Sequence, residues 1–140
     1  MGVNMQSIQS IVNKSHSLEN LEDLCCEILN LDPKIRFTGI INDKGKLLVE
    51  NKRKGLKVFI DSKDLEILLM ETALGVRMRR EHDEQLGQVN FTISYGRNMV
   101  SIIFPFESEI LCVTAEQDLD FLKISFLILQ LLEQKITKKD

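Results

Sequence analysis

The sequence predicts an α+β fold, in which a five-stranded, mostly antiparallel sheet has helices on both faces. Apolar residues recur at helical spacing near the N-terminus, over residues 62–86 and near the C-terminus. In the segments between them, apolar residues alternate with polar ones or run continuously, as in strands, and turn residues separate those segments. The expected order is therefore α-β-β-α-β-β-β-α.

Length and composition indicate one folded domain over residues 1–140, with an N-terminal helical segment at 1–31 and a frayed tail at 135–140. The hydrophobic fraction of 44% is ample for a core, and the 28% of charged residues is ordinary for a protein surface. The net charge of −3 argues against a nucleic-acid partner, because phosphate contacts need a basic patch.

The cysteines and the N-terminus indicate a reducing compartment. Cys25 and Cys26 are adjacent, which is not the C-x-x-C spacing of a redox or zinc site, and Cys112 lies in an apolar run. No signal peptide is visible, the Met-Gly start lacks the Ser or Thr that myristoylation requires, and no apolar run could span a bilayer. We expect a cytoplasmic protein with no membrane partner.

The N-terminal region, residues 4–31, has helical periodicity. A break near residues 15–17 divides it, with Ser17 as the N-cap of the second helix, and Pro33 ends it. His16 between two serines does not form a nucleophile elbow, and capping explains the serines better.

A hairpin follows. Residues 35–42 predict a strand, residues 42–45 (NDKG) a tight turn, and residues 46–50 the returning strand. One side of the first strand is expected to hold Ile35, Phe37, Gly39 and Ile41. Residues 51–55 are polar and basic, and residues 56–60 predict a short extended piece.

Residues 62–86 predict one long helix, capped by Asp61 or Ser62, that is apolar on two opposite sides. One side holds Leu65, Leu68, Leu69, Thr72 and Val76. The other holds Ile67, Met70, Leu74 and Met78. A surface helix of a monomer needs one apolar stripe, so the second indicates either a large core or a partner.

Three strands and a helix complete the chain. Residues 88–95 alternate, with Val89, Phe91, Ile93 and Tyr95 on one side. Residues 99–106 form the next strand, and the continuous apolar run at 110–114 suits a central strand covered on both faces. The last helix, residues 119–135, has a wide apolar arc and Asp118 or Asp120 as its cap.

This layout resembles the roadblock / dynein light chain family, a branch of the profilin-like and longin-like folds. The resemblance covers nearly the whole chain. It rests on the two glycines of the hairpin FTGIINDKG, on the long helix between the second and third strands, and on the closing pattern NMVSIIFPFESEILCVTAEQDLDFLKISF.

The resemblance implies a non-enzymatic dimer, because members of the family are small homo- or heterodimers whose second helices pair and whose sheets join through the third strand. They act as scaffolds or regulators of small Ras-like GTPases, or as adaptors on motors. Methionine is adaptable at such surfaces, which favours the Met-containing side for the interface. The expected interface is Ile67, Met70, Glu71, Leu74, Gly75, Met78 and Phe91.

Two charged clusters have the composition of candidate sites. Arg79 to Glu84 (RREHDE) could place His82 and a carboxylate at a metal or acid–base site, but i,i+4 pairs such as Arg79 with Asp83 or Arg80 with Glu84 explain it better. An arginine acting on a GTPase partner, which could be Arg77, Arg79 or Arg80, is a minor alternative. The basic run Lys52-Arg53-Lys54 with Lys57 is more typical of a solvated loop than of a site for an anionic ligand or a membrane surface.

The alternative function is a small-molecule sensor of the PAS or GAF kind. A sensor needs a roomy pocket with converging polar groups, whereas Phe37, Phe91, Phe104 and Phe106 favour a packed core. No catalytic triad, metal set or phosphate loop is visible, so we expect no catalytic residue, no cofactor and no metal.

Overall fold

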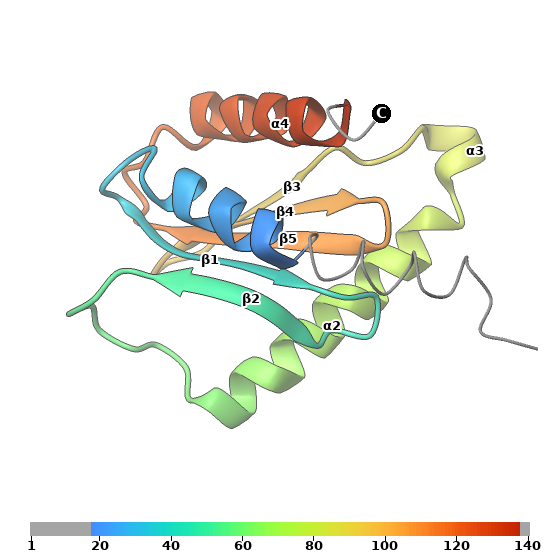
Figure 1. The fold of residues 1–140 in the computed structure, drawn as a ribbon. Helices are drawn as coiled ribbons and strands as arrows, with labels where there is room; N and C mark the ends of the chain where they lie inside the picture. Colours follow the sequence, from blue (N-terminus) through green and yellow to red (C-terminus); the bar gives the residue numbers. More distant parts are fainter. Residues whose placement is uncertain (1–17, 138–140) are drawn as a thin grey trace, which may run out of the picture.

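The computed structural model describes residues 18–137 and has three layers (Figure 1). The middle layer is a five-stranded sheet. A helix over residues 18–29, drawn in blue, and α4 (Phe121–Thr137) cover one face, and α2 (Ser62–Arg80) crosses the other. The predicted fold class is confirmed. The predictions at residues 15–17 lie outside the described residues.

All strand pairs of the sheet are antiparallel, and the spatial order is β2-β1-β5-β4-β3. The strands are β1 (Ile35–Ile41), β2 (Leu47–Lys52), β3 (Thr92–Tyr95), β4 (Val100–Phe106) and β5 (Glu109–Ala115). β5 lies at the centre and five of its seven residues are buried, which confirms the prediction from its continuous apolar run.

One prediction for β1 is wrong. Ile35 does not share a face with Phe37, Gly39 and Ile41, because the pairing of β1 with β5 shifts register between Ile35 and Phe37. Such an irregularity reverses the alternation of side chains. Ile35 consequently joins Ile40 in the core beneath helix 18–29 and α4, whereas Ile41 packs on the α2 side.

The two faces of the sheet have cores of unequal size. The larger lies beneath helix 18–29 and α4, where the Thr38 hydroxyl donates a 2.9 Å hydrogen bond to the Cys25 carbonyl. The smaller lies beneath α2 and consists of Ile41, Leu69, Ala73, Ile110 and Cys112, with partly buried neighbours around it. Cys112 is thus a small buried hydrophobe, as predicted. α2 buries only a narrow stripe of its surface.

The prediction of a single helix over residues 62–86 is also wrong. α2 ends at Arg80, and a separate turn of helix, α3 (Asp83–Leu86), follows a bend at Glu81 and His82. The Arg79 guanidinium donates to the Gly87 carbonyl at 3.2 Å, and that of Arg80 donates to the Glu107 carbonyl at 2.9 Å. These tertiary bonds fold the chain back toward the sheet, where a straight helix would continue into solvent.

The other predicted ends of helices and strands agree in part with the structure. Asp61 is the N-cap of α2, since its carboxylate accepts from the Asp64 amide at 2.8 Å, and Asp120 accepts from the Lys123 amide at 3.3 Å near the start of α4. A strand was predicted over residues 88–95, but β3 begins only at Thr92. Residues 88–91 are therefore not in a strand. Residues 56–60, for which a short extended piece was predicted, are not part of the sheet.

Candidate interaction surface

α2 turns one side to the sheet. Leu69 and Ala73 are buried at i,i+4 spacing, and Leu65, Thr72 and Val76 flank them and are partly buried. Leu68, predicted for this side, is instead exposed. Ala73 was not in the predicted set, although its small side chain suits the close contact that α2 makes with the sheet.

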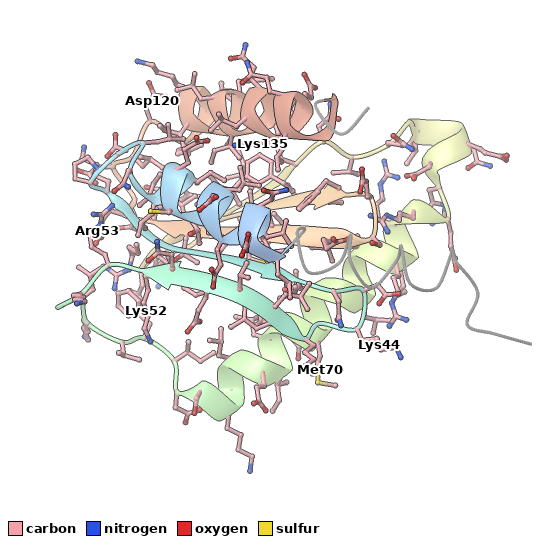
Figure 2. All side chains as sticks on the ribbon, in the orientation of Figure 1. Lys44, Lys52, Arg53, Met70, Asp120 and Lys135 are labelled. Carbon is pink, nitrogen blue, oxygen red and sulfur yellow. The ribbon has the colours of Figure 1, made fainter. Side chains whose placement is uncertain are left out.

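The opposite side of α2 is an exposed apolar stripe, which we call the outer face. Its fractional exposures are 48% for Ile67, 59% for Met70, 49% for Leu74 and 59% for Met78. Glu71 is exposed beside them. Figure 2 shows the Met70 side chain pointing away from the sheet. Large side chains grouped in this way on one helix are typical of an interaction site. The structure therefore brings together the α2 residues of the predicted interface.

The turn between β1 and β2 fixes the orientation of the outer face. The Asn42 side chain accepts from the amides of Lys44 and Lys46, both at 2.9 Å, and Gly45 takes a φ of +86°. The turn thereby reaches the backbone of α2, so close that a β-carbon on Gly45 would lie 2.7 Å from the Leu69 carbonyl oxygen. The short contact leaves α2 little freedom to rotate about its own axis.

A groove of ≈ 670 Å³ runs beside the outer face, between the C-terminal half of α2 and the β3–β4 edge of the sheet. Its apolar floor includes Ile103 and Pro105, and Gly75 lines its α2 wall. A β-carbon on Gly75 would meet no atom within 4 Å. No contact within the chain therefore requires glycine at this position, although glycine weakens a helix interior by about 1 kcal/mol relative to alanine.

The charged end of α2 forms part of this wall. Arg79 pairs with Asp83 at 3.1 Å, as predicted, but Arg80 does not pair with Glu84, because it binds the Glu107 carbonyl instead. Both guanidinium groups are thus used to hold the bend after α2. Among residues 18–137, no cluster of His, Cys, Asp and Glu has the arrangement of a metal site.

Phe91 lies on the other side of the sheet from α2. Its ring centroid is 5.7 Å from that of Phe104. The ring also makes an edge-to-face contact with Phe126 on α4, with the two centroids 5.3 Å apart. The structure therefore does not place Phe91 with the outer face. Sequence reasoning missed the exposure of Phe126 and Leu122 on α4, at 54% and 55%, although the wide apolar arc of this helix was a signal for it.

Comparisons with known proteins connect this geometry to a family. The sequence model of a family of unknown function, DUF6659, matches residues 15–138. The chain belongs to this family. No curated protein matches it. No helix in the described part of this family member combines the length and the hydropathy needed to cross a bilayer.

Solved structures show that this DUF6659 protein has the roadblock fold. A Roadblock/LC7 domain from Streptomyces avermitilis is similar with a TM-score of 0.62 at 10% identity, over 84% of this chain and 98% of that one. MglB from Myxococcus xanthus has a TM-score of 0.65 at 15% identity, over 85% and 93%. An MglB with a tetrameric arrangement has a TM-score of 0.59 at 15% identity, over 84% and 90%.

Proposed function

We propose that this protein is a non-enzymatic, dimeric interaction module in which the outer faces of two α2 helices pair. The observation that supports the proposal is the exposure of Ile67, Met70, Leu74 and Met78 on a helix whose other side already fills the core. Burying one such side chain is worth about 1.5–3 kcal/mol, so leaving this stripe in water is unfavourable for a lone protomer.

The neighbouring groove supports the same arrangement. A second α2 that crosses the first near Gly75 would approach it closely, since glycine has no side chain to separate the helices. β3 pairs only with β4 within residues 18–137, so its free edge is open to a strand of a second copy. One MglB of the same fold forms a tetrameric arrangement.

The partner we propose is a small Ras-like GTPase or another cytoplasmic protein, for which the dimer is a scaffold or regulator. This part rests on the roadblock fold and on the resemblance that the sequence shows. We do not propose an arginine finger from Arg79 or Arg80, because both guanidinium groups are bonded within the chain. The module would contribute shape and apolar contacts.

Light scattering on the purified full chain tests the dimer. We expect a dimer at micromolar concentration and a folded monomer for Met70→Glu and Leu74→Glu, because a carboxylate in a helix–helix interface cannot be desolvated cheaply. Leu122→Glu on α4 is the matched control, since its side chain is as exposed. A monomeric wild type, or dissociation by Leu122→Glu alone, would overturn the α2 interface.

The groove also favours a second candidate, a small-molecule sensor, because its volume is within the range of ligand sites. Its guanidinium groups, however, are held by intrachain bonds, and the Asp83 carboxylate pairs with Arg79, so these charged groups are already engaged within the chain. A rise in melting temperature with one member of a broad metabolite panel, abolished by Gly75→Leu, would support the sensor. No rise across the panel would exclude it in favour of the dimer.

A further inference from the structure

The segment that joins β2 to α2 is strongly basic. We call residues 52–60 (KRKGLKVFI) the basic loop: it contains Lys52, Arg53, Lys54 and Lys57 and no acidic residue. The whole chain has a net charge of −3, so positive charge is concentrated here against the overall balance. Asp61, the first acidic residue after the loop, has its carboxylate engaged as the N-cap of α2.

Two arginines hold the backbone of the basic loop. The Arg53 guanidinium donates to the carbonyls of Leu29 at 2.7 Å and Ile35 at 2.9 Å, which ties the start of the loop to the end of helix 18–29 and to β1. Arg36 donates to the Lys57 carbonyl at 2.6 Å and lies 4.7 Å from the centroid of the Phe59 ring. The loop is therefore a built structure whose outward side chains have a defined placement.

Those outward side chains are lysines interleaved with apolar residues. Lys52, Lys54 and Lys57 are exposed, and none of them belongs to a salt bridge within residues 18–137. The apolar side chains between them have exposures of 36% for Leu56, 76% for Val58 and 42% for Phe59. The nearby basic residues Lys34 and Arg36, by contrast, pair with Asp118 and Glu116. The Lys57 Nζ atom lies 5.8 Å from the centroid of the Phe59 ring, so positive charge without a salt bridge and exposed apolar surface lie in one place.

We propose that the basic loop binds the surface of a lipid bilayer that contains anionic headgroups. Apolar side chains on such a loop enter the boundary between headgroups and acyl chains, while lysines extend their ammonium groups back to the phosphates. A polybasic segment gains affinity from each lysine near an anionic leaflet. This interaction needs no spanning helix. It departs from the sequence-based expectations that the protein has no membrane partner and that the basic run is a solvated loop.

The shape of the loop favours a bilayer over an acidic protein. The segment between β2 and α2 projects beyond the end of the sheet (Figure 1), and its Val58 side chain is largely exposed. Apolar hot spots between proteins are enclosed in pockets, whereas a protrusion of this chemistry suits insertion into a soft surface. Lys52 and Lys44 lie at opposite ends of the β1–β2 hairpin (Figure 2), which provides a distant lysine for comparison.

Co-sedimentation of the full chain with vesicles tests the proposal. We expect binding to phosphatidylcholine vesicles with about 30% phosphatidylserine and none to pure phosphatidylcholine. Lys54→Ala should lower the partition coefficient about fivefold, the amount per lysine near an anionic surface. Lys44→Ala, which changes an exposed lysine at the far end of the hairpin, should lower it less than twofold. Val58→Asp should lower it at least fivefold, since it removes an inserting side chain and adds a negative charge.

Three results would overturn the proposal. The first is equal or absent binding of the wild type to the two kinds of vesicle. The second is an equal loss with Lys44→Ala and Lys54→Ala, which would show attraction by the whole surface instead of the basic loop. The third is that the wild type binds soluble polyglutamate but no vesicles, and that Lys54→Ala weakens the binding to polyglutamate. This result would indicate that the basic loop binds an acidic protein. Circular dichroism of each variant confirms that it is folded.

Discussion

A β-carbon placed on Gly45 would lie 2.6 Å from the Cα of Met70, closer than any real β-carbon contact. The turn between the first two strands therefore touches the backbone of α2 directly beneath a residue of its outer face. Gly45 also has a φ of +86°, which disfavours any other residue. The β1–β2 turn therefore holds α2 in place at Gly45, where a larger residue would be disfavoured by both the close contact and the backbone conformation.

Gly45→Ala should therefore destabilise the protein by about 2–4 kcal/mol, from backbone strain and from displacement of α2. Gly55→Ala is a matched control, because Gly55 has a similar φ of +79° but open space around its β-carbon position. It should cost only about 1 kcal/mol. Urea unfolding of both variants gives the two values. Equal losses would mean that the contact with Met70 is unimportant.

Gly75→Ala distinguishes the stability of a protomer from its assembly. In a monomeric background such as Leu74→Glu, alanine should stabilise the chain by about 1 kcal/mol, because it favours the helix and meets no atom of the protomer. In the wild-type background, the same methyl group should weaken the dimer if α2 helices cross here. Denaturant unfolding and dilution light scattering measure the two effects. Stabilisation of both would place the crossing elsewhere on α2.

The two buried thiols should make the protein less stable in alkali. Burial raises the pKa of Cys25 to about 11 and that of Cys112 to about 12 from an ordinary 9.0. Above pH 9 the unfolded chain therefore releases protons that the folded chain retains, and stability falls as the pH rises, by about 1.4 kcal/mol per pH unit per thiol. Urea unfolding between pH 8 and about 10.5 should show this slope.

Cys112→Ala should reduce the alkaline slope by the contribution of one thiol. A thiol reagent at pH 8 should modify only the exposed Cys26 rapidly in the native state. An unchanged slope in the variant, or three equally fast thiols, would contradict the burial of these side chains.

Arg53 should be far less tolerant of substitution than the lysine beside it. Its guanidinium donates to the carbonyls of Leu29 and Ile35 and to that of Asp32 at 3.2 Å, and lysine cannot reproduce this fork. Arg53→Lys should lower stability by about 2 kcal/mol, whereas the exposed Lys54→Ala should leave it within about 0.5 kcal/mol. Thermal unfolding followed by circular dichroism compares them. Similar melting temperatures would show that these hydrogen bonds contribute little.

Local patterns were sufficient for the order of the elements. The continuous apolar run of β5 and the 3.6-residue period of α4 each reflect burial that depends on local sequence alone. The wrong predictions concern features that depend on contacts with residues far away in the sequence. The end of α2 depends on carbonyls at Gly87 and Glu107, and the face of Ile35 depends on a register shift against β5. No local pattern contains that information.

The candidate surface was predictable to a similar extent. Two opposite apolar stripes on one helix were visible in the sequence, and the structure leaves Ile67, Met70, Leu74 and Met78 exposed. The groove was not predictable, because it depends on the angle at which α2 crosses the sheet and on Gly45, where the two meet. The projecting loop could be recognised as basic, but its support by Arg36 and Arg53 required the fold.

The position of β5 in the sheet has a consequence for synthesis of the chain. β1 and β5 are neighbours at the centre of the sheet, yet β5 leaves the ribosome only after β1, β2, α2, α3, β3 and β4. Until Glu109–Ala115 is available, the β1–β2 hairpin has an open edge and α2 has no Ile110 or Cys112 to cover. Closure of the sheet must therefore wait for this long-range pairing, and we expect nascent chains that stop before Glu109 to expose an open strand edge that favours aggregation.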